Sequence, residues 1–524
     1  MWRRAVLWLS LLASCMPWGV SRLPGRAPDF RDLAVAPAVP QASLAGAVVL
    51  LKLRHDPPEP LDADAGRTTL GWADLDALLT RLGAFALPAL PLPLEGMHDR
   101  VGLGRWVVLD LPSGIDLEAV ATHLRGHPEV EPGTVSFEDA GFLRVAAGSP
   151  TEAALLPLGR LRPRASASAP RAFVPAGASA ARLGAIPPEL ASLRASSAWA
   201  SATGAGIGVA VVGTGVDRNH LSLSGRLRAK LGEPVADDAD GNGIPGDVFG
   251  INLAHLAVVR GPGGTRLALA APDDWSDWSG VGEPVAAWGS GTAIASLAAG
   301  SGEGGSRLGV APDAWILPVD VQENLSPGRW VRGRDPRSRE LPASAAARAE
   351  LALRPESEWA RALGVAYAVS ERVRVVVCGW SSAERPAILR DVLRHAEDNC
   401  VVAICAPNAA QPDSGHLAPL AISRAVAAVS NPRNDQSPLP DRRVAPREGI
   451  DVSLGLNAGA AALLLSARPD LAPEDLHPIL GESPRLDLER ALRQARALPR
   501  GRCAHRVEPQ PVWQGHLSAS PSSP

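Results

Sequence analysis

Short runs of mostly apolar residues recur along the second half of the chain, and each is separated from the next by a spacer long enough for a helix. The runs cover residues 208–212, 315–319, 373–377, 401–404 and 425–429. Strands that are apolar on both faces are typical of a parallel sheet covered by helices on both sides. We therefore predict an α/β domain over residues 186–500, interrupted by a Pro- and Arg-rich surface insertion at 322–358.

A second, smaller pattern precedes this domain, over residues 44–148. Strand candidates lie at 47–53 and 105–111, helix candidates lie at 72–82 and 117–124, and a last extended piece follows residue 128. The elements alternate in the order β-α-β-β-α-β, which is typical of a small sheet with helices on one face. The sequence thus predicts a small α+β domain in front of the larger one.

The remaining segments lack a helical or strand period. Residues 21–43 are rich in Pro and Ala and are predicted to be a tether. Residues 149–185 are rich in Ala, Ser, Arg and Pro and are predicted to be a linker. Residues 501–524 form a tail without a domain of its own.

The first twenty residues have the layout of an export signal. A basic start is followed by the apolar run 5–12, which is too short to span a bilayer. The run ends in Leu-Ala-Ser-Cys15, which resembles a bacterial lipobox. Two interpretations stay open: Cys15 is lipidated, or residues 1–20 are an ordinary signal peptide and Cys15 is incidental. Both predict an exported protein, either an envelope lipoprotein or a secreted one.

Composition narrows the class of protein further. The 524 residues are 46% hydrophobic, which is ample for a buried core, and the net charge is −3. This balance gives no basic surface for nucleic acid, and it leaves a lipid anchor as the expected contact with a membrane. Beyond Cys15, four cysteines remain, at positions 378, 400, 405 and 503. They would permit two disulfides in an oxidising compartment, but Cys378 and Cys405 lie in apolar runs where cysteine acts as a small hydrophobic residue.

Glycines follow the first strand of the larger domain, in the sequence Gly213-Thr-Gly215-Val-Asp217. A dinucleotide-binding loop would need a third glycine, which is absent, so we set that interpretation aside. The segments that carry the chemistry are 209–220, 290–296 with 309–314, 402–408, and 449–466. In this order they resemble the conserved blocks of the subtilase family of serine proteases, and the resemblance extends over residues 192–497. It implies a subtilisin-like fold with a mostly parallel sheet.

The same resemblance argues against catalytic activity. The positions of the family's catalytic Asp, His and Ser hold Gly213, Ser290 and Asp451. A serine nucleophile needs an adjacent base, and the base needs an orienting partner, so the triad is degenerate at all three positions. Asn408 matches the family's oxyanion-hole residue, and an Asn that only serves a turn fits equally well. Ser453, two residues beyond Asp451, is the candidate for a rebuilt nucleophile.

Three functional hypotheses follow from this pattern. The first is a pseudoprotease that binds a peptide or protein in the family's substrate cleft. The alternative is an active serine endopeptidase with a rebuilt site. The third is a purely structural envelope protein. None of the three requires a cofactor.

An acidic loop at residues 237–243 resembles a loop common in the family. Asp238, Asp240 and Asn242 alternate before a glycine and could present oxygens to a structural Ca²⁺. The acidic residue expected at the twelfth position of such a loop is missing. A calcium site and a plain acidic turn therefore both stay open.

The small domain is similar, by pattern, to a subtilase propeptide. In the family such a domain folds against the protease and threads its end through the cleft. In a chain that cannot cleave itself, we expect residues 44–148 to stay attached and docked on that cleft.

Overall fold

The computed structural model describes residues 48–92, 97–138, 143–146, 155–158, 186–217, 220–230, 238, 242–253, 256–261, 264–270, 290–321, 357–379, 386–405, 450–481 and 486–503. The predicted signal segment 1–20, the tether 21–43, the strand at 425–429 and most of the insertion 322–358 lie outside these residues. So do most of the linker 149–185 and most of the tail 501–524.

The N-terminal part is an antiparallel four-stranded sheet with two helices. Its elements are β1 (Val48–Lys52), α1 (Ala73–Leu82), β2 (Phe85–Pro88), β3 (Trp106–Asp110), α2 (Leu117–Arg125) and β4 (Ser136–Glu138). The strand order is β2-β3-β1-β4. This succession of strands and helices agrees with the order expected from the sequence.

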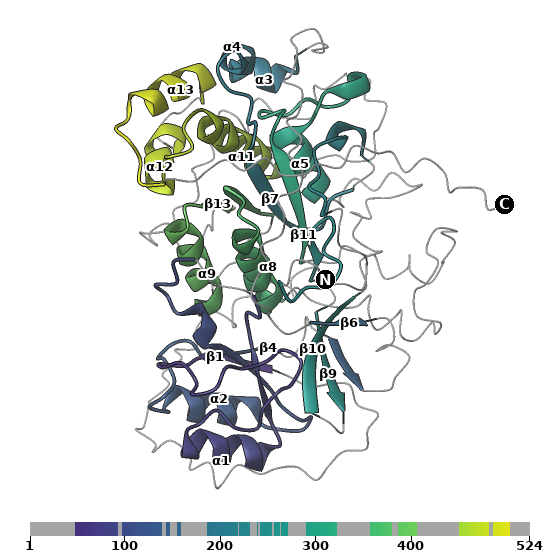
Figure 1. Ribbon diagram of the computed structural model, residues 1–524, viewed down its shortest axis with the longest axis vertical. Coiled ribbons are helices and arrows are strands. Elements are labelled where there is room, and N and C mark those ends of the chain that lie inside the picture. The colour runs from purple at the N-terminus through teal and green to yellow at the C-terminus, as the bar shows by residue number, and fades with distance from the viewer. Residues whose placement is uncertain are drawn as a thin grey trace, which may run out of the picture.

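Both faces of this small sheet are buried. Successive residues of its central strands, β1 and β3, point to opposite faces, and apolar residues lie on each face. Val49 and Val107 belong to the core beneath α1 and α2. Leu50 and Val108, one residue along each strand, point to the opposite face and join a core shared with the larger part of the molecule. The sheet is therefore a layer between its own helices and the rest of the chain, as Figure 1 shows.

The larger part is built on a five-stranded sheet in the order β13-β12-β7-β11-β8. Its strands are β7 (Gly208–Gly213), β8 (Ile251–Asn252), β11 (Trp315–Asp320), β12 (Val375–Cys378) and β13 (Val402–Cys405). All neighbouring pairs are parallel. The carboxyl ends of these strands therefore meet at one edge, which we call the carboxyl edge.

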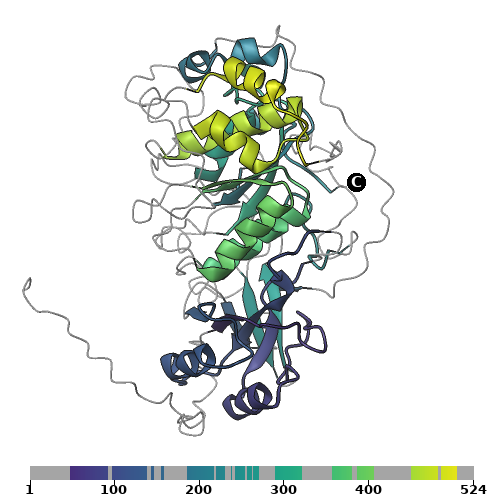
Figure 2. The ribbon, with the colours of Figure 1, turned by 90° about the vertical axis from the view of Figure 1, so that its left-hand side faces the viewer.

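Helices cover both faces of this sheet. One face carries α8 (Glu358–Ser370) and α9 (Ala387–Asp398), and the other carries α5 (Ser290–Ala299) and α11 (Ile450–Ala467). The shorter helices are α3 (Pro188–Ser192), α4 (Ala195–Trp199), α12 (Pro473–Gly481) and α13 (Leu488–Ala497). Figure 2 shows α8 and α9 between the parallel sheet and the N-terminal sheet. The predicted α/β fold, with helices on both faces and a small α+β domain in front, is confirmed.

A third sheet joins the two parts and was not expected from the sequence. Its order is β5-β9-β10-β6, with β5 (Leu143–Ala146), β6 (Leu155–Pro157), β9 (Ala257–Gly261) and β10 (Gly264–Ala270). Strand β6 lies within the segment 149–185 that the sequence predicts to be a linker. Its three residues are too few to show a period, and their pairing comes from β10, more than a hundred residues later.

One disulfide links Cys400, after α9, to Cys503, after α13, with a Cα–Cα distance of 6.0 Å. Cys378 and Cys405 are buried thiols, in line with their expected role as small hydrophobic residues. Among the described residues, no helix is both long and apolar enough to cross a membrane.

Candidate active site at the carboxyl edge of the parallel sheet

The carboxyl edge brings the ends of three strands together beside the first triad-equivalent position. Gly213 is the last residue of β7, and the residue before it pairs in register with Cys378 of β12. Cys378 in turn pairs with Cys405 of β13. A Cβ atom added to Gly213 would lie 3.6 Å from the Cα atom of Gly379, which is ordinary contact distance. The position has room for a side chain, and the sequence supplies none.

The second triad-equivalent position, Ser290, begins α5 beside the loop that follows β7. The backbone N–H of Gly291 donates to Thr214 Oγ1 over 3.0 Å, and the backbone N–H of Asp217 donates to Thr292 Oγ1 over 2.8 Å. A Cβ atom on Gly291 would lie only 1.9 Å from the carbonyl oxygen of Gly215. The two segments therefore touch backbone to backbone, which fixes Ser290 close to the end of β7.

The third position, Asp451, lies in the first turn of α11. Close approach between α11 and α5 depends on two glycines of α11. A Cβ atom on Gly455 would lie 2.9 Å from the carbonyl oxygen of Ile294, and one on Gly459 would lie 2.8 Å from the carbonyl oxygen of Ala298. The contacts advance along both helices in the same direction, so the helices run parallel. Extending this register by one turn brings residue 451 to the beginning of α5, at the carboxyl edge.

The structure thus brings the backbones of Gly213, Ser290 and Asp451 to one edge. The side chains of Ser290 and Asp451 lie outside the described part of the chain, and so does the whole of Asn408. The expectation that these residues replace a triad and an oxyanion hole stays a prediction.

Ser453, the candidate for a rebuilt nucleophile, is fully buried, with 0% of its surface exposed. Its hydroxyl makes no hydrogen bond within the described residues, and its carbonyl oxygen accepts from Asn457 Nδ2 over 2.9 Å. A nucleophile must reach both a base and a substrate. Among the described residues, no base lies within hydrogen-bond distance of the Ser453 hydroxyl. The burial of Ser453 also keeps that hydroxyl from a substrate.

Sequence reasoning missed a short chain of hydroxyl groups beside α5. His220 Nδ1 lies 2.7 Å from Ser222 Oγ, and Ser222 Oγ lies 2.7 Å from Ser296 Oγ. The first distance is within the range for a nucleophile and its base. Ser222 is 0% exposed, however, and Ser296 lies almost two turns into α5, away from Ser290. The arrangement ties the loop after β7 to α5 instead of presenting a hydroxyl to a substrate.

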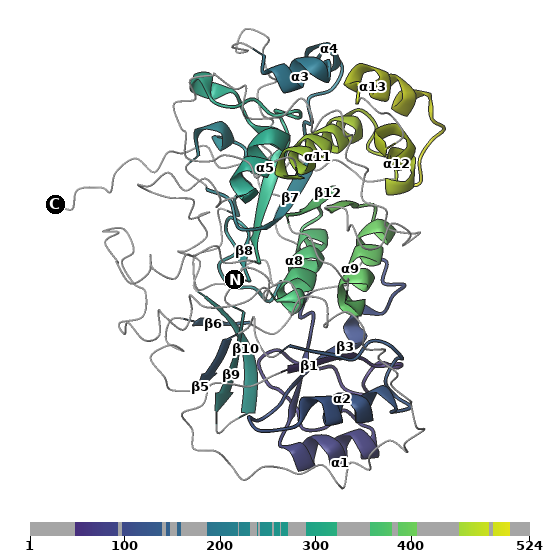
Figure 3. The same cartoon turned by 180° about the vertical axis from the view of Figure 1, so that it is seen from behind.

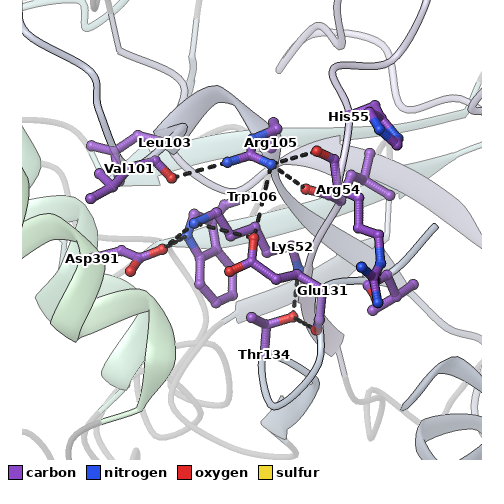
Figure 4. A network of polar contacts seen from close by, with 12 residues as sticks. Lys52, Arg54, His55, Val101, Leu103, Arg105, Trp106, Glu131, Thr134 and Asp391 are labelled. Atoms are coloured by element: carbon purple, nitrogen blue, oxygen red, sulfur yellow. Dashed lines mark hydrogen bonds and ion pairs between the residues drawn. The ribbon is translucent and has the colours of Figure 1, made fainter. Parts of the chain in front are cut away.

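Polar contacts also connect the N-terminal sheet to α9. Lys52 Nζ of β1 donates to Asp391 Oδ2 over 2.6 Å, and Trp106 Nε1 of β3 donates to the same oxygen over 3.1 Å. Lys52 Nζ also lies 3.5 Å from Glu131 Oε2. Figure 4 shows Asp391 reaching from α9 toward Lys52 and Trp106. The buried Lys52 ammonium is thus compensated by two carboxylates, one from each part of the molecule.

A second polar contact lies at the start of α8, close to the carboxyl edge. Glu138, the last residue of β4, accepts from Ser357 Oγ over 2.7 Å and from the backbone N–H of Trp359 over 2.8 Å. It therefore caps the helix N-terminus, where a carboxylate is favoured. Burial nevertheless raises the pKa of Glu138 to about 7, although both hydrogen bonds and the nearby Arg361 act in the opposite direction. Burial likewise lowers the pKa of Arg361 to about 10.

The predicted calcium ligands lie next to a buried cluster of paired charges. Asn242 Nδ2 donates to Asp247 Oδ2 over 2.9 Å and to Glu371 Oε1 over 3.3 Å. Lys230 Nζ lies 2.6 Å from Asp247 Oδ2, and Arg228 bonds Glu371. Burial would raise the pKa of Glu371, but the two cations hold it well below its usual range.

The amide oxygen of Asn242 accepts from the backbone N–H of Ile244 over 2.7 Å. Asn242 therefore turns its nitrogen, which cannot bind a cation, toward the carboxylates. Asp238 Oδ2 accepts from the backbone N–H of Gly243 over 3.1 Å, and Asp240 lies outside the described part of the chain. Where the chain is described, no group of three or more His, Cys, Asp or Glu side chains is placed to hold a metal. Of the predicted ligands, Asn242 fits a cation poorly, and the calcium site stays a prediction.

Comparison with known proteins agrees with this architecture. Residues 204–333 match the subtilase family, peptidase S8. This stretch contains β7, α5 and β11, with Gly213 and Ser290, whereas β12, β13 and Asp451 lie beyond it. The resemblance to the subtilase family that the sequence motifs indicated is therefore confirmed over this stretch.

Several solved structures resemble the chain at low identity. Fervidolysin from Fervidobacterium pennivorans, a keratinolytic enzyme related to subtilisin, is 14% identical with a TM-score of 0.44, and the match covers 90% of this chain and 65% of that one. A protease from Pseudoalteromonas arctica is 18% identical with a TM-score of 0.32, covering 58% and 94%. MycP1 with its N-terminal propeptide removed is 18% identical with a TM-score of 0.30, covering 58% and 96%. The chain spans about two thirds of the length of fervidolysin. A search among curated proteins found no significant match.

Proposed function

We propose that this chain is an exported, catalytically degenerate subtilase-fold protein that binds a peptide or protein segment along the carboxyl edge, in the position of the family's substrate cleft. The observation that carries the proposal is a contrast at this edge between the residues at three positions and the backbone contacts that bring those positions together. Gly213, Ser290 and Asp451 replace the catalytic residues. The contacts that bring their backbones together, such as Gly291 with Thr214, are intact.

Physical chemistry explains why such a site would bind without cleaving. A triad works through a base that removes the serine proton and a carboxylate that orients the base. Gly213 has no side chain to orient a base, and a serine at position 290 cannot act as one. Losing the nucleophile or the base alone lowers kcat by roughly 10⁶ in subtilisin. A carboxylate at position 451 would also repel the negative charge that develops on the substrate oxygen.

The alternative is a serine-type endopeptidase with a rebuilt site, and the family match itself favours it. It requires a nucleophile within about 2.6–3.2 Å of a base and open to the substrate. The burial of Ser453 weighs against it. The pair His220 and Ser222 meets the distance but not the access.

The experiment is hydrolysis of a broad fluorogenic peptide library by the purified chain, together with labelling by a serine-directed fluorophosphonate probe. Asp451→Ala and Ser453→Ala variants are measured beside it. We expect neither turnover nor labelling from protein whose folding is verified by circular dichroism. Turnover and labelling that both disappear in Ser453→Ala would instead establish the rebuilt enzyme.

The proposal of export rests on the N-terminal segment and on the cysteines. The disulfide between Cys400 and Cys503 is favoured in an oxidising compartment and supports it. Mass spectrometry of the mature N-terminus, with a Cys15→Ala variant for comparison, distinguishes a lipidated Cys15 from plain cleavage near residue 20. An N-terminus that still begins at Met1 would contradict export.

The N-terminal domain supplies a second feature of the proposal. Glu138 ends β4 at the start of α8, beside the carboxyl edge. This placement supports the hypothesis that the small domain stays docked near the cleft. A chain that binds added peptide equally well with and without its N-terminal domain would argue against occupation of the cleft by that domain.

A further inference from the structure

Two neighbouring strands of the parallel sheet end in cysteine. Cys378 is the last residue of β12 and Cys405 is the last residue of β13, and the two are paired in register. The residues before them, Val377 and Ile404, belong to the core on the α5 and α11 side, whereas both cysteines belong to the core on the α8 and α9 side. Figure 3 shows β12 between α11 on one side and α8 and α9 on the other. Both thiols therefore point to the same face of the sheet. We call Cys378 and Cys405 the thiol pair.

The spacing of the strands sets the distance between the two sulfur atoms. Side chains in register on neighbouring strands stand roughly perpendicular to the sheet, so their ends lie about one strand spacing apart, roughly 4.8 Å. A disulfide needs its sulfurs about 2.0 Å apart, so closing one here would require the strands to approach each other. An ion between two thiolates needs them about 4.6 Å apart if each bond has the length of a zinc–sulfur bond, about 2.3 Å. The sheet as it stands therefore suits a bridging ion better than a disulfide.

The thiol pair lies at the carboxyl edge, next to the first triad-equivalent position. Cys378 pairs in register with Val212, the residue before Gly213. The residue after Cys378, Gly379, donates its backbone N–H to the carbonyl oxygen of Val212 over 2.8 Å. Cys378 is 1% exposed and Cys405 is 9% exposed. The pair is thus shielded from water, and its more accessible side is that of Cys405.

A buried guanidinium accompanies the thiol pair. Arg361 of α8 is 3% exposed, and it lies close enough to Cys378 for their charges to interact. Its Nη1 donates to Glu358 Oε1 over 2.6 Å. A guanidinium has five N–H donors, so Arg361 can face a second anion as well. Negative charge on the sulfur atoms would therefore be compensated by a cation within the protein.

The number and kind of ligands select the class of ion. Thiolates are soft ligands that favour monovalent copper, zinc or iron–sulfur clusters. Zinc and iron–sulfur sites use four ligands, and the described part of the chain offers no group of three or more His, Cys, Asp or Glu side chains placed to hold a metal. Two thiolates beside one buried cation suit a monovalent ion, because the complex then carries a single negative charge.

We propose that Cys378 and Cys405 bind one monovalent copper ion between them, across the ends of β12 and β13. On binding, two S–H bonds break and two Cu–S bonds form, both protons pass to solvent, and no electron is transferred. One positive ion and two thiolates leave one negative charge, which Arg361 compensates. The ion joins the two strand ends beside Gly213. This inference stands whether or not the carboxyl edge binds a peptide.

The test is a copper titration of the full chain carrying Cys15→Ala, in which Cys378 and Cys405 are the only cysteines outside the disulfide. Cu(I) is supplied without oxygen, in competition with the chromogenic chelator bicinchoninate. We expect this parent chain to withhold one ion from the chelator, and Cys378→Ser and Cys405→Ser to withhold none, with folding verified by circular dichroism. No retention by the parent chain, or equal retention by both serine variants, would overturn the proposal.

X-ray absorption at the copper edge examines the parent chain without a substitution at the site. Two sulfur ligands and no third donor are expected. A spectrum that requires three or more ligands would contradict binding by the thiol pair. Peptide mapping without reductant examines the competing state. A disulfide between Cys378 and Cys405 in the chain as isolated would also overturn the proposal, because the two sulfurs would then be bonded to each other.

A variant of Arg361 tests the compensating charge. Arg361→Met should lower the affinity for Cu(I) by about tenfold or more, because a buried negative complex loses a cation. Arg361→Lys, which keeps the charge without the planar guanidinium, should fall between. Arg125→Met is the control, since Arg125 is exposed and pairs with Glu118 on α2. Equal affinities for Arg361→Met and Arg125→Met would overturn the role given to Arg361.

Discussion

The backbone N–H of Gly291 donates to the hydroxyl of Thr214 over 3.0 Å, so the first turn of α5 rests directly on the loop that follows β7. This contact depends on a glycine, because a Cβ atom at position 291 would lie 1.9 Å from the carbonyl oxygen of Gly215. The contact joins the end of β7, which carries Gly213, to the start of α5, which carries Ser290.

Gly291→Ala should therefore destabilise the protein by at least about 2 kcal/mol, since the backbone must shift to relieve the overlap. In an open helix the same change would stabilise by up to about 1 kcal/mol, which makes the sign informative. Gly104→Ala is the control, because a Cβ atom there meets nothing within 4 Å. Urea denaturation checks both variants. A Gly291→Ala protein as stable as the wild type would mean that α5 does not lie against the loop.

The buried charge cluster around Glu371 predicts a large effect of removing one cation. Arg228→Met should lower the free energy of unfolding by about 3–5 kcal/mol, because Glu371 would keep its charge with one neutralising partner fewer. Arg125→Met, at an exposed pair with Glu118, should change it by less than about 1 kcal/mol. The same denaturation measurement compares the two. Similar losses in both variants would contradict the buried pairing.

Glu138 predicts a dependence of stability on pH. Its pKa is about 7 in the folded protein, above the ordinary value of 4.5, so the folded state binds the proton more tightly than the unfolded state. Its contribution is fully present below pH 4.5 and is lost as the pH rises toward 7, by at most about 3 kcal/mol. Glu138→Gln should remove this part of the slope, whereas the exposed Glu118→Gln should leave it. Thermal unfolding between pH 4 and 8 measures the difference. An unchanged slope in Glu138→Gln would show that this carboxyl does not titrate in that range.

The disulfide predicts a redox-dependent stability. Cys503→Ser should lower the free energy of unfolding by about 2–4 kcal/mol, because the bond closes a long loop in the unfolded chain. Dithiothreitol should lower the melting temperature of the wild type and leave that of Cys503→Ser unchanged. A reductant effect of equal size in both proteins would point to a different target.

Much of the fold could be predicted from the sequence because its signals are local. Valine-rich runs mark β7 and β12, and an amphipathic pattern marks α2. Each of these signals is complete within a few residues. The sheet β5-β9-β10-β6 could not be predicted in this way, since β6 has three residues and obtains its hydrogen bonds from β10, more than a hundred residues later.

Some features of the candidate site could likewise be predicted from the sequence, and others could not. The positions of Gly213 and Ser290 follow from motifs with fixed flanking residues. The burial of Ser453 does not follow from them, because it depends on how α11 packs on α5. The hydrogen bond from Arg260 Nε to Asp110 Oδ2 could not be predicted either, since a single Asp at the end of a strand does not indicate a partner 150 residues away.

The bond between Cys400 and Cys503 also has a topological consequence. It turns 103 residues of sequence separation into a covalent ring that contains β13 and the three helices α11, α12 and α13. A single cut of the backbone anywhere within that ring opens it without dividing the molecule, so both products of the nick stay on one polymer until the sulfurs are reduced. After such a nick, Asp451 at the start of α11 would still be joined covalently to β13.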